Sequence, residues 1–453
     1  MAGKQPPKIE DFLEKRLIAA TNEDLEKARA AFRAKLGRDE AALLNSCIHC
    51  GLCAEACHYY LSDPQPENLP AYKLGLVIKV FKRHFTPSGR LAPGWVGAKD
   101  LDADRVREWI DALFGRCSLC GRCSLSCTMG IGISSLIRTA RGLLTSLDLV
   151  PSGLDSTVKT AVEKGNNMGI DREDWVETVD WLSEELRTET GDPEASLPMD
   201  KTGSRVLYTV NPREPKFFPL SLLAAARIFH AAGESWTLSS ADFDATNYGL
   251  YSGDDEVSAL LSGRLLKTAV ALGAEALILP ECGHGFNSNR WEAPEWIGRA
   301  HPVDVRSILE VTVDYVKQGR IRLDPARNPK KTTLHDPCNL VRLGGVAEEQ
   351  RFLLKRAATD FVEMTPNREK NYCCGGGGGQ LSMTAFADRR IKAGGIKAEQ
   401  IRKTGAQVVA TPCHNCIDQL LELNKFYKLG VEIRTVSEIV ADALILDTPD
   451  RRD

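Results

Sequence analysis

The segment Cys47-Ile-His-Cys50-Gly-Leu-Cys53-Ala-Glu-Ala-Cys57 places four cysteines within eleven residues. The same spacing returns in Cys117-Ser-Leu-Cys120-Gly-Arg-Cys123-Ser-Leu-Ser-Cys127. A third group lies between residues 338 and 416, so the three groups hold thirteen of the fourteen cysteines. Clustered cysteines outside a secreted disulfide framework are typical of metal–thiolate sites. The sequence therefore predicts a protein whose chemistry depends on bound metal.

The composition is that of a soluble globular protein of two or three domains, with 453 residues, 43% hydrophobic and 26% charged. Its net charge of −3 argues against nucleic acid as a partner, because domains that bind nucleic acid are usually basic. The apolar stretches 220–226 and 269–279 are shorter than the roughly 20 residues of a membrane-spanning helix. The first residues contain neither an apolar core nor a twin arginine, so the sequence predicts no export signal.

Both regular runs match the spacing of bacterial ferredoxins, in which three thiolates of one run and the fourth of the other hold a [4Fe-4S] cube. Zinc is the alternative, but zinc sites usually take two Cys-x2-Cys pairs separated by a longer loop. We therefore predict two cubane clusters that carry electrons. Their expected ligands are Cys47, Cys50, Cys53 and Cys127 for the first cluster, and Cys117, Cys120, Cys123 and Cys57 for the second.

The pattern of apolar residues changes along the chain. The predicted parts are an N-terminal arm and helix (1–40), a mainly helical ferredoxin-type domain (41–187), a linker (188–204) and an α/β domain (205–453). The helix of the first part is expected to start at a cap on Thr21 or Asn22 and to end before Gly37. The linker is polar and rich in Gly and Pro. In the last part short apolar strands alternate with helices, and the strands are expected at Val206–Val210, Ala276–Leu279, Thr332–Leu334 and Val408–Ala410.

The α/β part contains a sequence repeat. Its clearest blocks pair Gly273-Ala-Glu-Ala-Leu-Ile-Leu-Pro-Glu-Cys282 with Gly405-Ala-Gln-Val-Val-Ala-Thr-Pro-Cys413. Two further blocks follow the same order at similar spacing, which favours a duplication over chance. The predicted copies are a degenerate first repeat (205–300), which keeps one cysteine, and a cluster-binding second repeat (330–450), which keeps five.

The third group has the spacing Cys338-x34-Cys373-Cys374-x38-Cys413-x2-Cys416. Five cysteines are more than one cube or one zinc ion needs. Five glycines, Gly375 to Gly379, follow the paired cysteines, and their backbone N–H groups can approach an anionic cluster closely. A flexible linker or a phosphate loop is the alternative, but the run lacks the Lys-Ser/Thr ending of a nucleotide P-loop. Gly375, Gly376 and Gly377 are therefore candidate cofactor-binding residues.

This Cys…Cys-Cys-Gly…Cys-x2-Cys pattern resembles the cysteine-rich CCG domain of heterodisulfide reductases. With the two upstream runs, residues 40–450 resemble the D-type subunit of those enzymes. The sequences His335-Asp-Pro-Cys-Asn339, Cys373-Cys-Gly-Gly-Gly-Gly-Gly379 and Glu281-Cys-Gly-His284 are similar to DsrK-type iron–sulfur subunits of sulfur-metabolising membrane complexes. The resemblance implies one noncubane [4Fe-4S] cluster at which disulfides react. Its implied ligands are Cys338, Cys373, Cys374, Cys413 and Cys416.

The chain departs from two-cluster CCG domains in its first repeat. Non-ligand residues stand roughly where the ligands of that copy would be, namely Arg213, Gly249, Leu250 and Gly285. Cys282 remains, and we expect a redox-active thiol or an auxiliary ligand, with an inert buried cysteine as the alternative. His284 could supply a proton or be an ordinary turn histidine. His335 and His414 flank ligand cysteines and are expected to tune the cluster.

The leading functional hypothesis is an electron-transfer subunit with thiol–disulfide oxidoreductase activity. The resemblance implies a membrane cytochrome b partner linked to quinone, and hence a peripheral place on the cytoplasmic face of the membrane. A hydrogenase or a small thiol/disulfide carrier protein is a further possible partner. The alternative is a non-catalytic relay between a hydrogenase and the membrane cytochrome. A third interpretation, the iron–sulfur subunit of a glycolate- or lactate-type oxidase, shares the order of modules.

Overall fold

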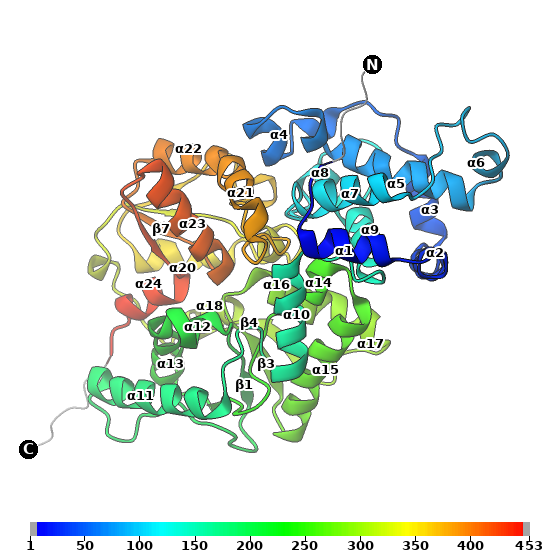
Figure 1. The fold of residues 1–453 in the computed structure, drawn as a ribbon. Helices are drawn as coiled ribbons and strands as arrows, with labels where there is room; N and C mark the ends of the chain where they lie inside the picture. The colour runs from blue at the N-terminus through cyan, green and yellow to red at the C-terminus, as the bar shows by residue number, and fades with distance from the viewer. Residues whose placement is uncertain (1–6, 447–453) are drawn as a thin grey trace, which may run out of the picture. The chain divides into compact units, whose positions relative to one another are not determined.

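The computed structural model describes residues 7–446, and the chain forms two compact units that are discontinuous in sequence (Figure 1). Unit 1 comprises residues 1–157, 248–255 and 372–397. Unit 2 comprises residues 158–247, 256–371 and 398–453. The predicted parts were continuous ranges, whereas each unit takes up segments that are distant along the chain. In the described residues, the longest helices are too polar or too short to cross a lipid bilayer.

Unit 1 is helical and has no β-strand among its described residues. Its helices are α1 (Asp11–Ala19), α2 (Asn22–Lys35), α3 (Arg38–Asn45), α4 (His58–Ser62), α5 (Pro70–Phe85), α6 (Pro87–Leu91), α7 (Ala103–Trp109), α8 (Arg122–Leu125), α9 (Ile133–Thr145), α14 (Gly249–Ser252) and α21 (Ala387–Ala393). Helices α2 and α5 both pack on α9, as Figure 1 shows for α5. Three helices pass from one unit to the other along the chain, namely α10 (Ser152–Lys164), α15 (Asp255–Ala271) and α22 (Gly395–Thr404).

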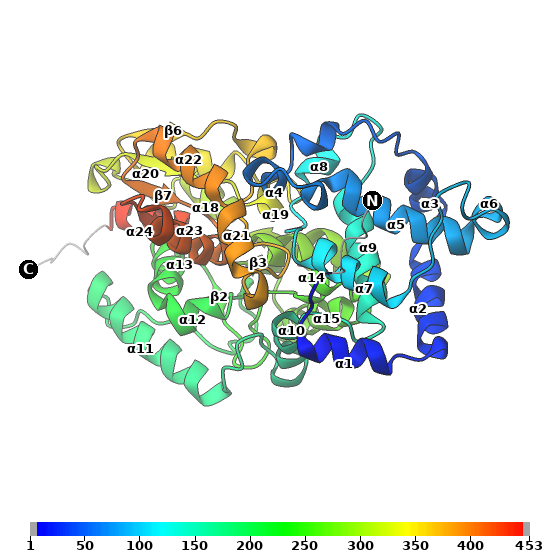
Figure 2. The ribbon, with the colours of Figure 1, turned by 45° about the horizontal axis from the view of Figure 1, so that its top comes forward.

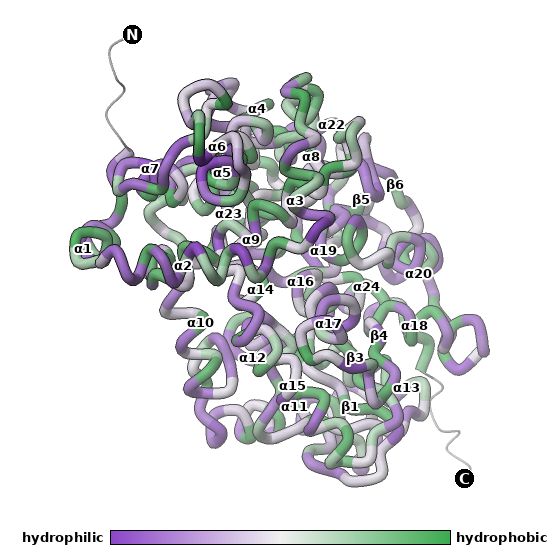
Figure 3. Tube along the Cα trace, turned by 90° about the vertical axis from the view of Figure 1, so that its right-hand side faces the viewer, coloured by the Kyte–Doolittle hydropathy of each residue, from purple (hydrophilic) through white to green (hydrophobic). Residues whose placement is uncertain are grey.

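The predicted helix of the first part is confirmed as α2. The Thr21 side chain accepts a hydrogen bond from the Asp24 backbone N–H and the Asp24 side chain accepts one from the Thr21 backbone, which forms a capping box. Ala28 and Phe32 are buried, and the tube of α2 alternates between hydrophilic and hydrophobic colours in Figure 3. The segment predicted as an arm also contains a helix, α1, which buries Leu13 and Leu17. Its sparse apolar residues gave too little periodicity to reveal it.

Unit 2 is an α/β structure whose eight described strands are short. They are β1 (Val206–Tyr208), β2 (Trp236–Thr237), β3 (Ala276–Leu279), β4 (Asp304–Ser307), β5 (Thr332–Leu334), β6 (Phe361–Glu363), β7 (Val408–Ala410) and β8 (Glu432–Arg434). The helices of this unit are α11 (Arg172–Thr190), α12 (Arg213–Phe217), α13 (Pro219–Ala231), α16 (Gly283–Phe286), α17 (Ala293–Ile297), α18 (Ile308–Lys317), α19 (Cys338–Val341), α20 (Glu349–Ala357), α23 (His414–Tyr427) and α24 (Val436–Ala443). Three of the four predicted strands have the expected bounds, and β1 ends two residues earlier.

The strands form two sheets of four, with the orders β2-β1-β3-β4 and β6-β5-β7-β8. All neighbouring strands are parallel. The central strands β1 and β3 pair Val206 with Ala276, and β5 and β7 pair Thr332 with Val408. Helices α20, α23 and α24 lie beside β7 in both Figures 1 and 2. Because parallel strands end at the same edge of a sheet, the loops after β5 and β7 are neighbours, as are those after β1 and β3.

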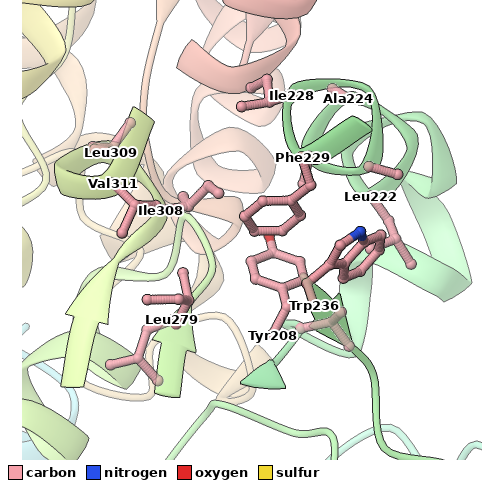
Figure 4. Close-up of a cluster of buried hydrophobic side chains, with 14 of the residues drawn as sticks. Tyr208, Leu222, Ala224, Ile228, Phe229, Trp236, Leu279, Ile308, Leu309 and Val311 are labelled. Atoms are coloured by element: carbon pink, nitrogen blue, oxygen red, sulfur yellow. The ribbon is translucent and has the colours of Figure 1, made fainter. Parts of the chain in front are cut away.

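An aromatic cluster forms part of the core of unit 2 (Figure 4). The ring of Phe229 lies 5.3 Å from that of Tyr208 and 4.8 Å from that of Trp236, measured between ring centroids. Leu279, at the end of β3, and Ile308, at the start of α18, are fully buried beside this cluster. This packing fixes the first sheet against its helices and so holds the loops that follow β1 and β3.

A buried ion pair holds the loop after β5. The guanidinium of Arg351 in α20 donates two hydrogen bonds of 2.8 Å to the carboxylate of Asp336. It also donates to Glu363 in β6 at 2.8 Å, and Asp336 accepts a further bond from the Arg368 backbone. Arg351 and Asp336 are each 1% exposed. Asp336 lies two residues before Cys338, so this pair sets the position of a predicted ligand.

We expect Arg351→Ala to lower the free energy of unfolding by about 3–5 kcal/mol, because it leaves the buried Asp336 carboxylate without its cation. Urea denaturation under anaerobic conditions measures this loss. Arg402→Ala is the matched control, since Arg402 pairs with Glu399 at the surface and such pairs contribute less than about 1 kcal/mol. Equal effects of the two substitutions would contradict the structural role of Arg351.

Candidate metal centres

The two ferredoxin-type runs have the same backbone conformation. Each loop contains two residues with positive φ, which are His49 (54°) and Gly51 (79°) in the first and Leu119 (51°) and Gly121 (74°) in the second. A short helical turn follows each glycine. These left-handed residues curl each loop around its cysteines, and glycine adopts the conformation at little cost.

The first run and the end of the second line one cavity. Its walls include Cys47, Cys50, Cys53 and Cys127, together with apolar side chains such as Leu74 and Ile133. Burial, together with the nearby charges of Cys47 and Cys127, raises the pKa of the Cys53 thiol. Four thiols facing one apolar cavity are the donor set that a [4Fe-4S] cluster requires, so these residues fit that group.

The predicted ligands of the second cluster lie mainly on the second ferredoxin-type loop. Burial and the charges of Cys117 and Cys57 raise the pKa of Cys123, which shows that these three thiols are neighbours. The fourth predicted ligand, Cys120, has its sulfur within 4.8 Å of a ring nitrogen of His58 and of Cys373 Sγ. Unit 1 therefore contains neighbouring thiols from both predicted ligand sets, each with a contribution from both runs.

Two buried cations near the second loop were not predicted from the sequence. Arg141 in α9 is fully buried and donates to the backbone carbonyls of Cys117 (2.7 Å) and Leu113 (2.8 Å). Burial lowers its pKa to about 10, so it remains charged at neutral pH. Lys73 in α5 is 1% exposed, and its charge acts on Cys123. Both cations would offset the negative charge of a thiolate-bound cluster. In the sequence, a basic residue on an otherwise apolar helix face could have revealed each of them.

Three of the five cysteines of the third group belong to unit 2. Cys338 is the first residue of α19, which follows β5. Cys413 is the N-cap of α23, which follows β7, and Cys416 lies one turn further on. The adjacent Cys416 thiol and backbone N–H groups lower the pKa of Cys413 to about 7 despite its burial. A ring nitrogen of His335 lies within 4.8 Å of Cys416 Sγ, so the carboxyl ends of both strands contribute to this group.

The other two cysteines, Cys373 and Cys374, belong to unit 1 and are buried. The Gly375 backbone N–H donates to Cys373 Sγ at 3.3 Å. Positive φ angles occur at Gly375 (105°), Gly378 (67°) and Gly379 (80°), as expected for a run that turns tightly. The glycine run thus supplies a backbone donor to a predicted ligand.

Cys282 lies at the end of the loop that follows β3, as the N-cap of α16, and is fully buried. Its sulfur accepts a hydrogen bond from Asn211 Nδ2 (3.4 Å) and lies 3.4 Å from His284 Nδ1. Burial, together with the charge of Cys413, raises the pKa of Cys282 well above its ordinary value. The Gly283 backbone N–H donates to Cys413, so Cys282 and its neighbour lie next to a predicted ligand.

The two histidines of this region are also buried. Burial and the charge of Arg213 lower the pKa of His284 to about 3 and that of His414 to about 4. His414 Nδ1 lies 3.2 Å from the carbonyl oxygen of Glu281. His284 Nδ1 lies 3.4 Å from Cys282 Sγ, and its role as a proton donor stays a prediction.

Buried carboxyl groups surround the loop that follows β1. Glu214 accepts a hydrogen bond from the Asn211 backbone (2.6 Å), and burial raises its pKa to about 8. Burial likewise raises the pKa values of Asp244 and Glu281 to about 7. The Glu281 carboxylate accepts hydrogen bonds from the Val436 and Ser437 backbones at the start of α24. The sequence did not reveal this group, because its members are isolated acidic residues along the chain.

Two family models match the chain at these sites. Residues 43–131 match the 4Fe-4S dicluster domain, and residues 332–420 match the cysteine-rich domain called CCG. The predicted resemblance is confirmed. The chain combines a helical iron–sulfur domain with an α/β part that carries the CCG domain.

Curated relatives align with most of this chain. An Hdr-like menaquinol oxidoreductase iron–sulfur subunit of Archaeoglobus profundus is 28% identical over 95% of this chain and 83% of its own length. The corresponding subunit 2 of Archaeoglobus fulgidus is 27% identical over 89% and 80%. The D-type subunit of the dihydromethanophenazine:CoB–CoM heterodisulfide reductase of Methanosarcina mazei is 25% identical over 89% and 95%. The chain is similar to iron–sulfur subunits of oxidoreductase complexes.

Double substitutions test the expected pairing of ligands between the two runs. We expect Cys47→Ala with Cys127→Ala to remove about four irons, because both changes affect one [4Fe-4S] site. Cys47→Ala with Cys57→Ala should remove about eight, because the changes affect two sites. Iron analysis and electron paramagnetic resonance (EPR) of the anaerobically reconstituted protein measure both losses. The reverse result would mean that each run holds its own cluster.

The pKa of Glu214 predicts a pH dependence of stability. The folded protein keeps this proton up to about pH 8, whereas the unfolded chain releases it near its ordinary value of 4.5. The free energy of unfolding therefore falls as the pH rises through this window. We expect Glu214→Gln to flatten the fall in denaturation midpoints measured between pH 5 and 8, and the surface change Glu399→Gln to leave it unchanged. An unaltered slope in Glu214→Gln would show that its carboxyl group is already ionised.

Proposed function

We propose that this protein is the iron–sulfur subunit of a membrane-associated redox complex that connects a quinone pool to thiol–disulfide chemistry. The observation that carries the proposal is the placement of two sets of ferredoxin-type cysteines and the Cys373–Cys374 pair in the same compact unit. The names of the relatives support this proposed function, because they are menaquinol oxidoreductase and heterodisulfide reductase subunits.

The proposed cofactors are two [4Fe-4S] cubanes and one noncubane [4Fe-4S] cluster. The first cubane is assigned to the cavity lined by Cys47 and Cys127, and the second to the set around Cys123. The third is assigned to the five cysteines of the CCG pattern, flanked by Gly375–Gly377, His335 and His414. When bound, these groups would supply electron transfer in single-electron steps. The protein supplies thiolates, the Gly375 and Gly283 backbone donors and the buried cation Arg141.

The α/β part is interpreted as a duplicated CCG domain with one functional half. Its two sheets have corresponding strand orders, and α12 and α16 follow β1 and β3 as α19 and α23 follow β5 and β7. The paired segments 248–255 and 372–397 also belong to the same unit. In the first half Arg213 forms an ion pair with Asp418, two residues beyond Cys416. Arg213 stands roughly where a ligand of the first half would be, which supports a one-sided reaction, and its ion pair fits either balance of the cluster charge or an ordinary salt bridge.

Cys282 and His284 are proposed as the residues that handle the substrate sulfur. A disulfide takes up two electrons and two protons to give two thiols, so the site needs a partner for the first sulfur released. The Cys282 thiol lies beside Cys413, and Asn211 and His284 fix its position. His284 is assigned a positioning role, because its Nδ1 lies 3.4 Å from Cys282 Sγ. An inert Cys282 is the competing interpretation, and the experiment below separates the two.

The proposed partner is a membrane cytochrome b-type subunit that exchanges electrons with quinone, which would place this chain on the cytoplasmic face of the membrane. The proposed substrate is a thiol/disulfide carrier protein. Small disulfides can replace it in experiments. A relay without disulfide chemistry, for example from a hydrogenase, is the second candidate. It is favoured by the presence of a full set of ligand cysteines in only one of the two repeats.

Single-turnover reoxidation tests the function. The anaerobically reduced protein is mixed with cystine, glutathione disulfide or a disulfide-bearing carrier peptide, and the iron–sulfur absorbance is followed. We expect reoxidation by at least one disulfide and a slower reaction in Cys282→Ser, because the first sulfur released loses the thiol proposed as its partner. Iron content must match between the two proteins.

The outcomes distinguish the hypotheses. Reoxidation by a quinone analogue but by none of the disulfides would support the relay and contradict the enzyme. Equal rates in the wild type and Cys282→Ser would identify Cys282 as inert while leaving disulfide reduction intact. Thr188→Ala serves as the control, because Thr188 is exposed on α11 and its hydroxyl donates to the Glu184 carbonyl of the same helix.

A further inference from the structure

Within unit 1, a residue of the second ferredoxin loop forms a hydrogen bond with Cys373. The Ser118 hydroxyl donates a hydrogen bond to Cys373 Sγ at 3.5 Å and lies 2.9 Å from His58 Nε2. Ser118 and His58 are each 2% exposed, so this chain of contacts is shielded from water. Ser118 follows Cys117 directly, and His58 follows Cys57. One predicted ligand of the CCG group is thus linked to residues beside two predicted ligands of the second cubane.

The glycine run makes this approach possible. A Cβ on Gly378 would lie 2.6 Å from the carbonyl carbon of Ser118, so only glycine fits at that position. The Gly378 carbonyl accepts a hydrogen bond from Arg141 (2.9 Å), and Gln380 Nε2 donates to the Cys117 carbonyl (3.2 Å). Arg141 therefore holds the second ferredoxin loop and the glycine run at once. Cys373 Sγ lies within 4.8 Å of Cys120 Sγ as a result.

The first ferredoxin loop has no equivalent contact among the described residues. Ile48 occupies the position that corresponds to Ser118, and it is 65% exposed. Cys50, the counterpart of Cys120, is exposed as well. The two loops share a backbone conformation but differ in surroundings: the first is open to solvent, and the second is covered by residues 373–380.

From this asymmetry we infer that electrons pass between the second ferredoxin site and the CCG group through Cys120 and Cys373, and that Ser118 is the residue that positions this junction. The inference rests on the proposed function and names its internal route. Electron tunnelling weakens steeply with distance, so the pair of ligands in closest approach dominates the path. The exposed first site then exchanges electrons with the proposed cytochrome b-type partner.

The electron count is simple. A quinol gives up two electrons and two protons, and the electrons cross the Cys120–Cys373 junction one at a time. A disulfide takes up both electrons with two protons and becomes two thiols. In the opposite direction two thiols lose two electrons and two protons, and the same junction carries the electrons to a quinone.

Ser118→Ala tests the inference in the full-length protein with all clusters bound. The change removes the hydroxyl that donates to Cys373 and leaves every predicted ligand in place. Hydrogen bonds to ligand sulfurs raise the reduction potential of iron–sulfur centres. In an EPR-monitored redox titration we expect the potential of the CCG centre to shift downward and that of the first cubane to remain unchanged. Freeze-quench EPR after reduction by a menaquinol analogue should show electrons retained at the second ferredoxin site.

Gly378→Ala is the second variant, because its Cβ forces the glycine run away from Ser118. We expect a weaker magnetic interaction between the reduced second cubane and the CCG centre. Ser126→Ala is the matched control, since Ser126 lies exposed on the same ferredoxin run. Wild-type potentials and transfer rates in Ser118→Ala, at full iron content, would overturn the inference even if Gly378→Ala failed to fold. If no disulfide reoxidises the protein but these shifts occur, the proposed function fails and the route stands.

Discussion

Convergence of cysteine side chains from distant parts of the chain is the constraint on which the rest of the structure depends. A cluster site needs several sulfurs at nearly the same place, and each sulfur can reach it only if its backbone approaches without a clash. In unit 1 the left-handed residues of the two ferredoxin loops and the glycine after Cys374 provide this approach. The buried cations Arg141 and Lys73 then make a concentration of negative sulfur tolerable in a low-dielectric interior.

In unit 2 the same constraint is met by sheet geometry. Parallel strands deliver the loops after β5 and β7 to one edge, where helix starts offer N–H groups to Cys413. The loops after β1 and β3 have the same arrangement but carry Asn211, Arg213 and Cys282. The two sheets have corresponding strand orders but differ in electrostatics: thiols predominate at one, and buried carboxyl groups with raised pKa values surround the other.

The sequence predicted the features that depend on local patterns. Cysteine spacing indicated the iron–sulfur domains, apolar runs located β3, β5 and β7, and the Thr21 cap located α2. Features that depend on long-range packing were not predictable. Neither the placement of Cys373 with the ferredoxin loops nor the role of Ser118 has a local signature, because a serine between cysteines is typical of an ordinary loop. The ligand assignments, the noncubane centre and the role of Cys282 remain predictions with the experiments described above.

The discontinuous course of the chain has a consequence for how the protein can be divided. The backbone passes between the two units five times, and unit 1 is completed by segments 248–255 and 372–397. A fragment ending near residue 157 would lack the carbonyl groups of Tyr251 and Gly378, so Arg141 would lose two of its hydrogen-bond acceptors. The N-terminal half is thus not expected to fold as a stand-alone electron carrier, because unit 1 includes segments from later in the chain. Gene fission or limited proteolysis between residues 188 and 204 would yield two pieces that must reassociate to complete either unit.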